Sequence, residues 1–344
     1  MQLFINTYGT YIHVKDEMFE IRVPIEDKKE YKKHHFAAKK VSNIMVPKGA
    51  ALSSDAVILA LKYNIDILFV DYNGQPLGRV WHSKLGSTTR IRKMQLQASM
   101  SSDGLKWIKT WISEKIENQI NFIKDLKKHR SKMTEYLDNK IEKLEDIVVS
   151  VGQLEGESVQ QFADTLRGLE GTAGRLYFET LSYVLPDHYK FDGRSSRPAK
   201  DPFNTFLNYA YGVLYGKVEK CLIIAGIDPY LGFMHRDDYN QLSMVYDFIE
   251  PYRTHAETVV FRLFTAKKVK NTHTDMITNG YSLNKEGKEL LINSFNQYFD
   301  TDTIRYKGRN QTRSNALQMD AHSFANSLIK NRENKSTTLN IETI

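Results

Sequence analysis

The chain has 344 residues, enough for two domains, one of them with a substantial hydrophobic core. Hydrophobic residues make up 41% of the sequence and charged residues 26%, as in an ordinary globular protein. No apolar run approaches the ~20 residues of a membrane-spanning helix, and the N-terminus does not have the pattern of a signal peptide. The 48 Lys and Arg residues against 41 Asp and Glu give a net charge of +7, a mild bias toward polyanions.

The single cysteine, Cys221, excludes a disulfide framework and fits a reducing cytoplasm. It lies in the apolar run CLIIAGI, with no electropositive partner nearby in the sequence. We therefore expect a buried, unreactive thiol rather than a nucleophile.

The first part of the chain has the pattern of β-strands. Two short runs flank Asp16 and Glu17 in a hairpin pattern, and a short helix is expected over residues 53–63. The run IDILFVD then leads through Asn73-Gly74, a hairpin turn, into PLGRVW. The charged stretch EDKKEYKKHHFAAKK is expected to be a solvated loop or helix face, with a basic contact surface as the alternative.

From about Ile91 the apolar period becomes helical. Later helical patterns cover residues 162–176, 241–265 and 285–298, and Asp201 with Pro202 should cap a helix that runs to about Ala225. The sequence thus predicts an α+β fold with a β-rich domain (residues 1–88) and a larger all-α domain (89–330). A linker is expected near residues 84–92, and residues 331–344 should form a disordered tail.

Three segments of the helical part could carry chemistry, and the first is RGLEGTAGRLYF. Glu170 borders the apolar stripe of its helix, where a carboxylate must be neutralised. Arg175 could supply that charge, so a simple ion pair competes with a functional role. Gly171 and Gly174 weaken the helix by about 1 kcal/mol each, which suits a close approach by another backbone or a ligand.

The other two segments are YLGFMHRDD and SMVYDFIEPYR. His235 follows an apolar loop, where a hydrogen-bonded structural histidine is the ordinary alternative to a ligand. Asp247 and Glu250 share one helix face, which more often means a solvated surface. Pro251 should break the helix there, because it removes a donor and clashes with the carbonyl of Asp247. Glu250 would then stand at a discontinuity where its side chain can be aimed.

Between these segments, a basic loop leads into a polar and aromatic stripe. A DNA backbone is one partner that suits such an arrangement, and core packing of the tyrosines is the equal alternative. The stripe has the helical spacing i, i+4, i+7, i+11. The loop and stripe residues are Arg194, Arg197, Lys200, Asn204, Asn208, Tyr211 and Tyr215.

The order LEGxxGRxYF, RxxRPxxDPFNxxLNYxYxxLY, GFMH, SMVYDFIEPYR resembles the CRISPR-associated adaptation integrase family, often called Cas-one. The resemblance is dense between Leu169 and Arg253. It extends more loosely over residues 1–330 and includes KIENQ at residues 115–119 and VPKGAALSSDAVILALKYNIDILFVDYNGQPLGRV. In such proteins a Glu, a His and a third acidic residue bind a divalent metal. By motif position these are Glu170, His235 and Glu250, with Asp247 as a neighbouring or alternate ligand.

The ligand set implied by the resemblance suits Mg²⁺ or Mn²⁺, because carboxylate oxygens and one imidazole leave coordination positions open. The implied reaction is transesterification, in which a 3′-hydroxyl of spacer DNA attacks a phosphodiester of the repeat array. Hydrolysis of DNA would use the same site with water as the nucleophile. Arg175 joins the seven loop and stripe residues as a candidate DNA contact.

The resemblance also implies partners. These are double-stranded DNA, a second copy of the chain in a homodimer formed through the β-rich domain, and a small Cas-two protein in a heterohexamer. Two alternatives stay open at this point. One is a stand-alone, structure-specific nuclease of DNA repair, and the other is a non-catalytic DNA-binding scaffold of the same fold.

Overall fold

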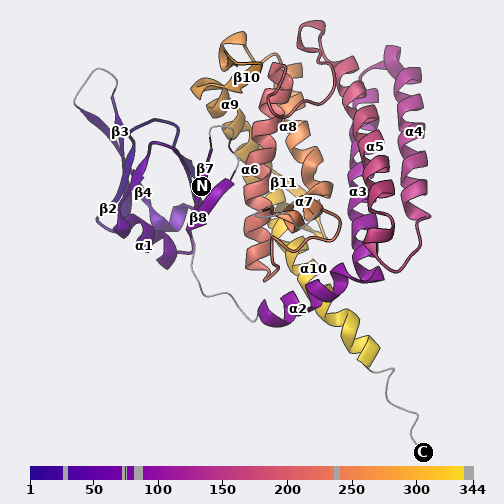
Figure 1. Cartoon of the computed structure of the whole chain (residues 1–344). Coiled ribbons are helices and arrows are strands. Elements are labelled where there is room, and N and C mark those ends of the chain that lie inside the picture. Colours follow the sequence, from indigo (N-terminus) through magenta and orange to yellow (C-terminus); the bar gives the residue numbers. More distant parts are fainter. Residues whose placement is uncertain (26–29, 72–73, 75, 81–87, 236–240, 337–344) are drawn as a thin grey trace, which may run out of the picture. The chain divides into compact units, whose positions relative to one another are not determined.

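The structure is a computed structural model that describes residues 1–25, 30–71, 74, 76–80, 88–235 and 241–336 (Figure 1). It divides into two compact units that interleave along the sequence, whereas the sequence suggested one boundary between residues 88 and 89. Unit 1 consists of Met1–Lys84, Ser196–Gly216 and Lys267–Tyr298. Unit 2 consists of Leu85–Ser195, Lys217–Ala266 and Phe299–Ile344. No helix in the described part of the chain is long and apolar enough to span a membrane.

Unit 1 is built on two four-stranded sheets. The sheets have the strand orders β1-β5-β7-β8 and β4-β3-β2-β6, and helix α1 shares their core. Buried aliphatic residues of both sheets pack together with Ala56, Leu59 and Ala60 of the helix. The elements are β1 (Gln2–Phe4), β2 (Tyr11–Lys15), β3 (Met18–Pro24), β4 (Tyr31–Ala37), β5 (Asn43–Pro47), β6 (Ala51–Leu52), α1 (Ser54–Lys62), β7 (Asp66–Val70) and β8 (Pro76–Val80).

The expected hairpins of the first part are confirmed. Asp16 and Glu17 have φ values of 51° and 57°, the left-handed conformation that a two-residue turn between β2 and β3 requires. Strands β7 and β8 pair antiparallel, and of the expected turn between them Gly74 is described whereas Asn73 lies outside the described residues.

Part of the charged stretch at residues 26–40 is a β-strand rather than a loop or helix face. Residues Tyr31–Ala37 form β4, at the edge of its sheet, and Lys32 and Lys33 are exposed there. An edge strand tolerates lysines because they keep one side wet and discourage pairing with other chains. Residues 26–29 lie outside the described residues.

The later segments of unit 1 add helices and a hairpin. They comprise the first part of α6 (Pro202–Ile224), β9 (Thr274–Ile277), β10 (Gly280–Leu283) and α9 (Lys285–Asn296). Asp201 caps α6 as expected, because its Oδ1 accepts a hydrogen bond from the Asn204 amide at 2.8 Å. Thr278 and Asn279 form the two-residue turn between β9 and β10, with a φ of 66° at Asn279.

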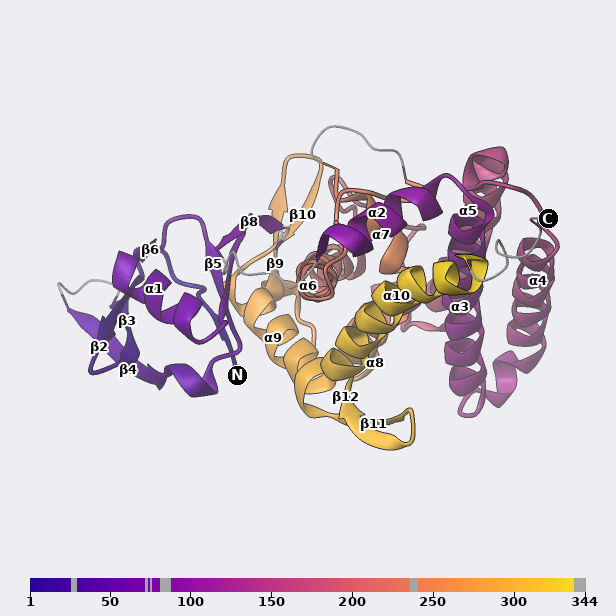
Figure 2. The same ribbon diagram turned by 90° about the horizontal axis from the view of Figure 1, so that it is seen from below.

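Unit 2 is mostly helical, as predicted. Helices α3, α4 and α5 lie side by side, and α10 packs against α2 (Figures 1 and 2). The elements are α2 (Thr88–Ser99), α3 (Ser102–Lys127), α4 (Thr134–Gly152), α5 (Ala163–Val184), the end of α6, α7 (Ser243–Phe248), η5 (Glu250–Tyr252), α8 (Arg253–Thr265), β11 (Thr303–Tyr306), β12 (Arg309–Thr312) and α10 (Arg313–Ser336). Cys221 is buried, as expected.

Three expectations for the chain after residue 83 need correction. The hairpins β9–β10 and β11–β12 were missed, because their strands are only four residues long and too polar to show a period. Residues 88–92 of the expected linker belong to α2, and residues 84–87 lie outside the described residues. Helix α10 continues to Ser336, into the segment expected to be disordered, because Arg, Glu and Lys favour a helix.

A buried carboxylate holds the β2–β3–β4 sheet together across its strands. Glu20 on β3 contacts Arg22 at 2.7 Å, His13 of β2 at 2.8 Å and His35 of β4 at 2.8 Å. Hydrogen bonds from Arg22 and then His13 outweigh burial and lower the pKa of Glu20 from 4.5 to about 2.

This pKa makes a prediction for stability. A carboxyl whose pKa is lowered on folding stabilises the folded state at pH values above its ordinary pKa of 4.5. That stabilisation is lost as the pH falls toward the folded-state pKa of about 2. Thermal unfolding of the wild type should therefore show a steeper fall in Tm over this window than unfolding of Glu20→Gln. Parallel acid limbs for the two proteins would contradict the assignment.

Candidate metal centre

One ammonium group lies between two acidic side chains in unit 2. The Lys115 Nζ is 2.6 Å from Glu170 Oε1 and 2.5 Å from Glu250 Oε2. Arg253 binds the other oxygen of Glu250, at 2.7 Å from its Nε. Lys115 and Glu250 are buried, whereas the Glu170 side chain keeps 22% of its surface exposed. The expected neutralisation of Glu170 is present, but Lys115 provides it.

Arg175 does not pair with Glu170. Its guanidinium is exposed and lies 3.7 Å from Glu179, one helical turn further along α5. The sequence did contain a sign of the true partner. Lys115 falls inside the apolar stripe of α3, beside Ile112 and Ile116, where a lysine must have a buried counter-charge.

The break at Pro251 positions Glu250. Helix α7 ends at Phe248, and the short 3₁₀ segment η5 at Glu250–Tyr252 separates it from α8. This confirms the predicted interruption. The Asn118 side chain of α3 donates to the Pro251 carbonyl at 2.9 Å, so α3 holds the turn as well as its carboxylate.

The charges of the cluster fix its protonation. Burial by itself would raise the pKa of Glu250, but Arg253 and Lys115 lower it to about 2. Burial likewise opposes the charge on Lys115, yet the carboxylates of Glu250 and Glu170 outweigh it and raise the pKa of the ammonium. Glu250 and Lys115 are therefore both charged at neutral pH.

Asp247 faces the loop that carries His235. Its Oδ2 accepts hydrogen bonds from the amides of Phe233 at 2.5 Å and Met234 at 3.0 Å. Its Oδ1 accepts the His235 amide at 3.2 Å and lies 2.6 Å from the Nδ1 of the His235 ring. The carboxylate thus fixes both the loop backbone and the ring orientation, and leaves Nε2 as the nitrogen that can bind another group.

Sequence reasoning missed a second support of this loop. Gln95 of α2 is buried, and its amide nitrogen donates to the carbonyls of Asp228 at 2.9 Å and Leu231 at 2.8 Å. The Asp228 amide donates in return to the Gln95 side chain at 2.9 Å. A buried glutamine in a helix of otherwise modest amphipathicity is the feature that could have indicated this role.

The donor set fits a divalent cation in its chemistry. Two carboxylates already converge on one cationic group, and the imidazole is oriented by a carboxylate as metal-binding histidines are. In the described part of the chain, no three acidic, His or Cys side chains converge closely enough to hold an ion as they stand. The Lys115 ammonium lies where the two carboxylates meet. The pKa of His235 is raised as well. Burial by itself would lower it, but the negative charges of Asp247, Glu250 and Glu170 outweigh burial.

The glycines beside Glu170 face open space. A Cβ added to Gly168, Gly171 or Gly174 would meet no other atom within 4 Å. No backbone in the described part of the chain approaches these glycines closely. They leave a low surface on α5 next to the exposed edge of Glu170.

The candidate DNA contacts divide into buried and exposed groups. Asn204 and Tyr211 are buried, and the Asn204 side chain donates to Asp201 at 2.6 Å, so core packing accounts for them and a DNA-facing role does not. Asn208 donates to the Ser196 carbonyl at 2.8 Å, and Tyr215 lies near Tyr211 with ring centroids 6.5 Å apart.

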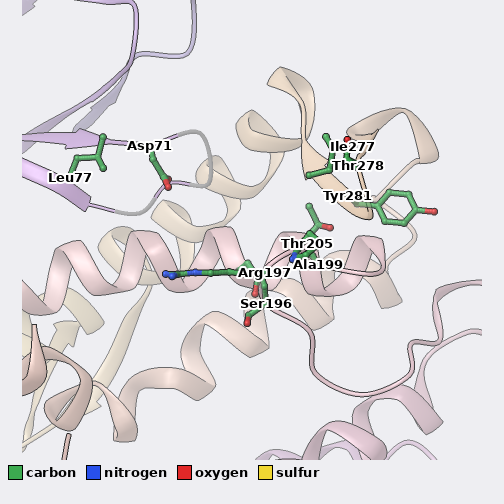
Figure 3. A pocket seen from close by; sticks show the side chains of 11 residues that line it. Asp71, Leu77, Ser196, Arg197, Ala199, Thr205, Ile277, Thr278 and Tyr281 are labelled. Carbon is green, nitrogen blue, oxygen red and sulfur yellow. The ribbon is translucent and has the colours of Figure 1, made fainter. Parts of the chain in front are cut away.

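The basic residues before this helix are less enclosed. Lys200 is exposed and donates to the Asn279 carbonyl at 2.8 Å. Arg194 donates to the Ser195 carbonyl and lies over the Phe178 ring. Arg197 is exposed, and with Asn208, Asp71 and Tyr281 it lines a pocket of about 620 Å³ in unit 1 (Figure 3). No metal ligand of the proposed set lies in this pocket.

Comparison with known proteins gives the family. The sequence profile described as CRISPR associated protein Cas1 matches residues 3–297. The chain belongs to the Cas1 family. It is 30% identical, over 93% of its length and 94% of the relative's, to "CRISPR-associated endonuclease Cas1 1" of Archaeoglobus fulgidus. The resemblance inferred from the sequence is thereby confirmed.

Solved structures show the same fold. A casposase bound to integration product has a TM-score of 0.81 at 21% identity, with 96% of this chain and 91% of that chain covered. A Cas6-RT-Cas1–Cas2 complex has a TM-score of 0.76 at 20% identity, with 96% of this chain and 35% of that chain covered. The α+β class with a β-rich N-terminal part and a mostly helical remainder is therefore confirmed.

The contacts of Asp247 predict a structural cost when it is lost. Asp247→Ala would leave the Phe233 and Met234 amides buried without an acceptor, so unfolding free energy should fall by about 2–4 kcal/mol. Asp164→Ala is the matched control, because the Asp164 side chain is 98% exposed, and it should change the free energy by less than about 0.5 kcal/mol. Denaturant unfolding of both variants measures the difference. Equal losses would show that Asp247 does not hold the loop.

Proposed function

We propose that this chain is a divalent-metal-dependent DNA integrase of CRISPR adaptation. It would join 3′-hydroxyl ends of new spacer DNA to the repeat array by transesterification, and cut DNA when water replaces the hydroxyl. One observation carries the proposal most directly: Glu170 and Glu250 converge on a single cationic position in a Cas1-family chain. The endonuclease name of the relative and the casposase with its integration product support the reaction class.

Glu170, Glu250 and the Nε2 of His235 would hold the metal, with Mg²⁺ or Mn²⁺ suited to these ligands. The bound ion would polarise the scissile phosphate and stabilise the charge that develops on it. Glu250 is proposed as the third ligand in preference to Asp247, because both Asp247 oxygens are committed to the loop amides and the His235 ring. Asp247 is then a positioning residue.

Lys115 and Arg253 supply positive charge to the same site. Both contact Glu250, and their charges balance those of Glu170 and Glu250. When a divalent cation neutralises the two carboxylates instead, the two basic groups become surplus charge beside the reacting phosphate. The open glycine face of α5 next to Glu170 gives DNA a path to them.

The proposed partners follow from the family and its neighbours. A Cas1–Cas2 assembly occurs in a structure of the same fold, which supports a Cas2 partner. We propose a homodimer formed through the β-rich part, a heterohexamer with Cas2, and a location in the cytoplasm. Duplex DNA, as spacer precursor and as repeat array, is the proposed substrate.

Strand transfer tests the function itself. Purified protein, its Cas2 partner and a duplex with 3′-hydroxyl ends would be mixed with a supercoiled repeat plasmid and Mn²⁺. Glu170→Gln and Glu250→Gln should each lower joining at least about 10²-fold, because each removes a charged ligand. Glu179→Gln on the same helix as Glu170 should keep wild-type joining, since Glu179 pairs with Lys140 at the surface. Full activity in Glu170→Gln would rule out the proposed centre.

Lys115 makes a separate prediction that needs no activity. In Lys115→Met no ammonium competes for the carboxylates, so Mn²⁺ affinity measured by calorimetry should rise on the order of tenfold. The Tm without metal should fall, since Glu250 stays buried with one cation fewer, and saturating Mn²⁺ should restore more of it than in the wild type. Lys217→Met removes a similarly enclosed lysine that pairs with Asp300, and it should leave Mn²⁺ affinity unchanged. Weaker Mn²⁺ binding in Lys115→Met would refute competition.

A further inference from the structure

The hairpin β11–β12 projects a basic, two-stranded ribbon from unit 2 (Figure 2). Residues 303–312 contain three basic residues, Arg305, Lys307 and Arg309, and no acidic residue. All three are exposed. Lys307 and Gly308 form the turn with φ values of 45° and 80°, so the two strands are closely paired up to their tip.

The two faces of the ribbon differ. Alternate residues of a strand point to opposite faces. Ile304 and Tyr306 are half-buried, whereas Thr303 and Arg305 are exposed. In the register of the pair, Arg305 lies opposite Asn310 and Thr303 opposite Thr312. The outward face therefore carries the Arg305 guanidinium, the Asn310 amide and the exposed Thr303 hydroxyl, which are groups that bind phosphate oxygens. Arg309 lies opposite Tyr306 on the other face and is exposed next to the turn.

The inner face is anchored through one carboxylate. Asp320 of α10 accepts hydrogen bonds from the Tyr306 hydroxyl and, at 3.2 Å, from the Lys307 ammonium. Its other oxygen accepts the Tyr252 hydroxyl at 2.9 Å. Tyr252 belongs to η5, the turn that also carries Glu250. Asp320 thus fixes the ribbon relative to the candidate metal centre.

Two of the three basic side chains of the ribbon have no acidic partner in the described part of the chain. In the part of the chain that the structure describes, Lys307 has Asp320 as a partner, whereas Arg305 and Arg309 have no ion-pair partner. A solvated face of a soluble protein usually mixes charges of both signs. A rigid ribbon whose charged side chains are all positive, and whose other exposed groups are neutral hydrogen-bond donors, suits a polyanion.

We propose that the exposed side chains of β11–β12 bind the phosphate backbone of duplex DNA next to the metal centre. This deepens the proposed function and rests on it, because the DNA is the substrate named there. Arg305 on the outward face and Arg309 next to the turn supply charge, Asn310 and Thr303 supply neutral hydrogen-bond donors, and Asp320 sets their position relative to Glu250. The contacts fix the DNA register and carry no base information.

The test is equilibrium binding of the full chain to a fluorescein-labelled DNA duplex, followed by anisotropy in the presence of a chelator. Salt is varied between about 0.05 and 0.2 M. The double variant Arg305→Gln, Arg309→Gln should bind about tenfold more weakly at the lower salt. Its slope of log affinity against log salt should be smaller by about 2, close to 0.9 for each lost phosphate contact.

Lys132→Gln, Lys143→Gln is the matched control, because it removes the same charge from exposed lysines near and on α4. The control should bind within about threefold of the wild type, and both double variants should keep the wild-type Tm. An equal loss in both variants would overturn the proposal, since total charge alone would then explain binding. Intact DNA binding with loss of the Cas2 complex would also overturn it and assign the ribbon to a protein partner.

The same binding experiment separates failure of the proposed integrase function from failure of the ribbon proposal. If the wild type itself binds no duplex, the proposed function and the ribbon proposal fall together. If the wild type binds duplex DNA and the Arg305→Gln, Arg309→Gln variant binds it with the same affinity, the ribbon proposal falls and the integrase proposal stands.

Discussion

The candidate site depends on one buried ammonium between two carboxylates. Lys115 is enclosed on α3, and its charge is retained only because Glu170 and Glu250 lie at hydrogen-bond distance on either side. Without that cation, Glu250 would be a nearly buried anion with Arg253 as its remaining partner. A buried charge with too few partners costs several kcal/mol, so the three elements that carry these residues are bound to one arrangement.

Helix α3 provides the rigid support for this arrangement. Lys115 reaches the carboxylates, Asn118 holds the Pro251 carbonyl, and Trp111 one turn earlier stacks on Phe233 with ring centroids 6.1 Å apart. Phe233 precedes His235 in the loop that Asp247 fixes. The same helix therefore orients the turn of Glu250 and the loop of His235. Segments distant in sequence therefore gain their relative positions from α3.

Much of the fold followed from the sequence, and the candidate site residues were proposed from it. The period change near Ile91, the turn at Asp16-Glu17 and the break at Pro251 are local effects of side-chain type, so they could be predicted without tertiary contacts. The motif order then assigned Glu170, His235 and Glu250 to one site. What failed were features that tertiary contacts decide. The sequence offered Arg175, five residues away, as one possible partner of Glu170, but the partner is Lys115 on another helix.

The same reason explains the other differences. Asp247 and Glu250 look alike in sequence, and only the contacts to backbone amides separate an orienting carboxylate from a candidate ligand. For Asn204 and Tyr211 the spacing left a DNA-facing role and core packing equally open, and their burial in α6 decides for the core. The short hairpins β9–β10 and β11–β12 lack an apolar period and are defined by the helices against which they pack.

The central claim is that one divalent cation takes the position at which the two carboxylates now meet Lys115. A crystal structure of the protein with Mn²⁺, with anomalous scattering to locate the ion, tests this most directly. The account predicts one ion bound by Glu170, Glu250 and the Nε2 of His235, with the Lys115 ammonium moved off at least one carboxylate and Asp247 still on the loop amides. An ion bound through Asp247, or Lys115 still bridging both carboxylates beside an ion held elsewhere, would contradict it.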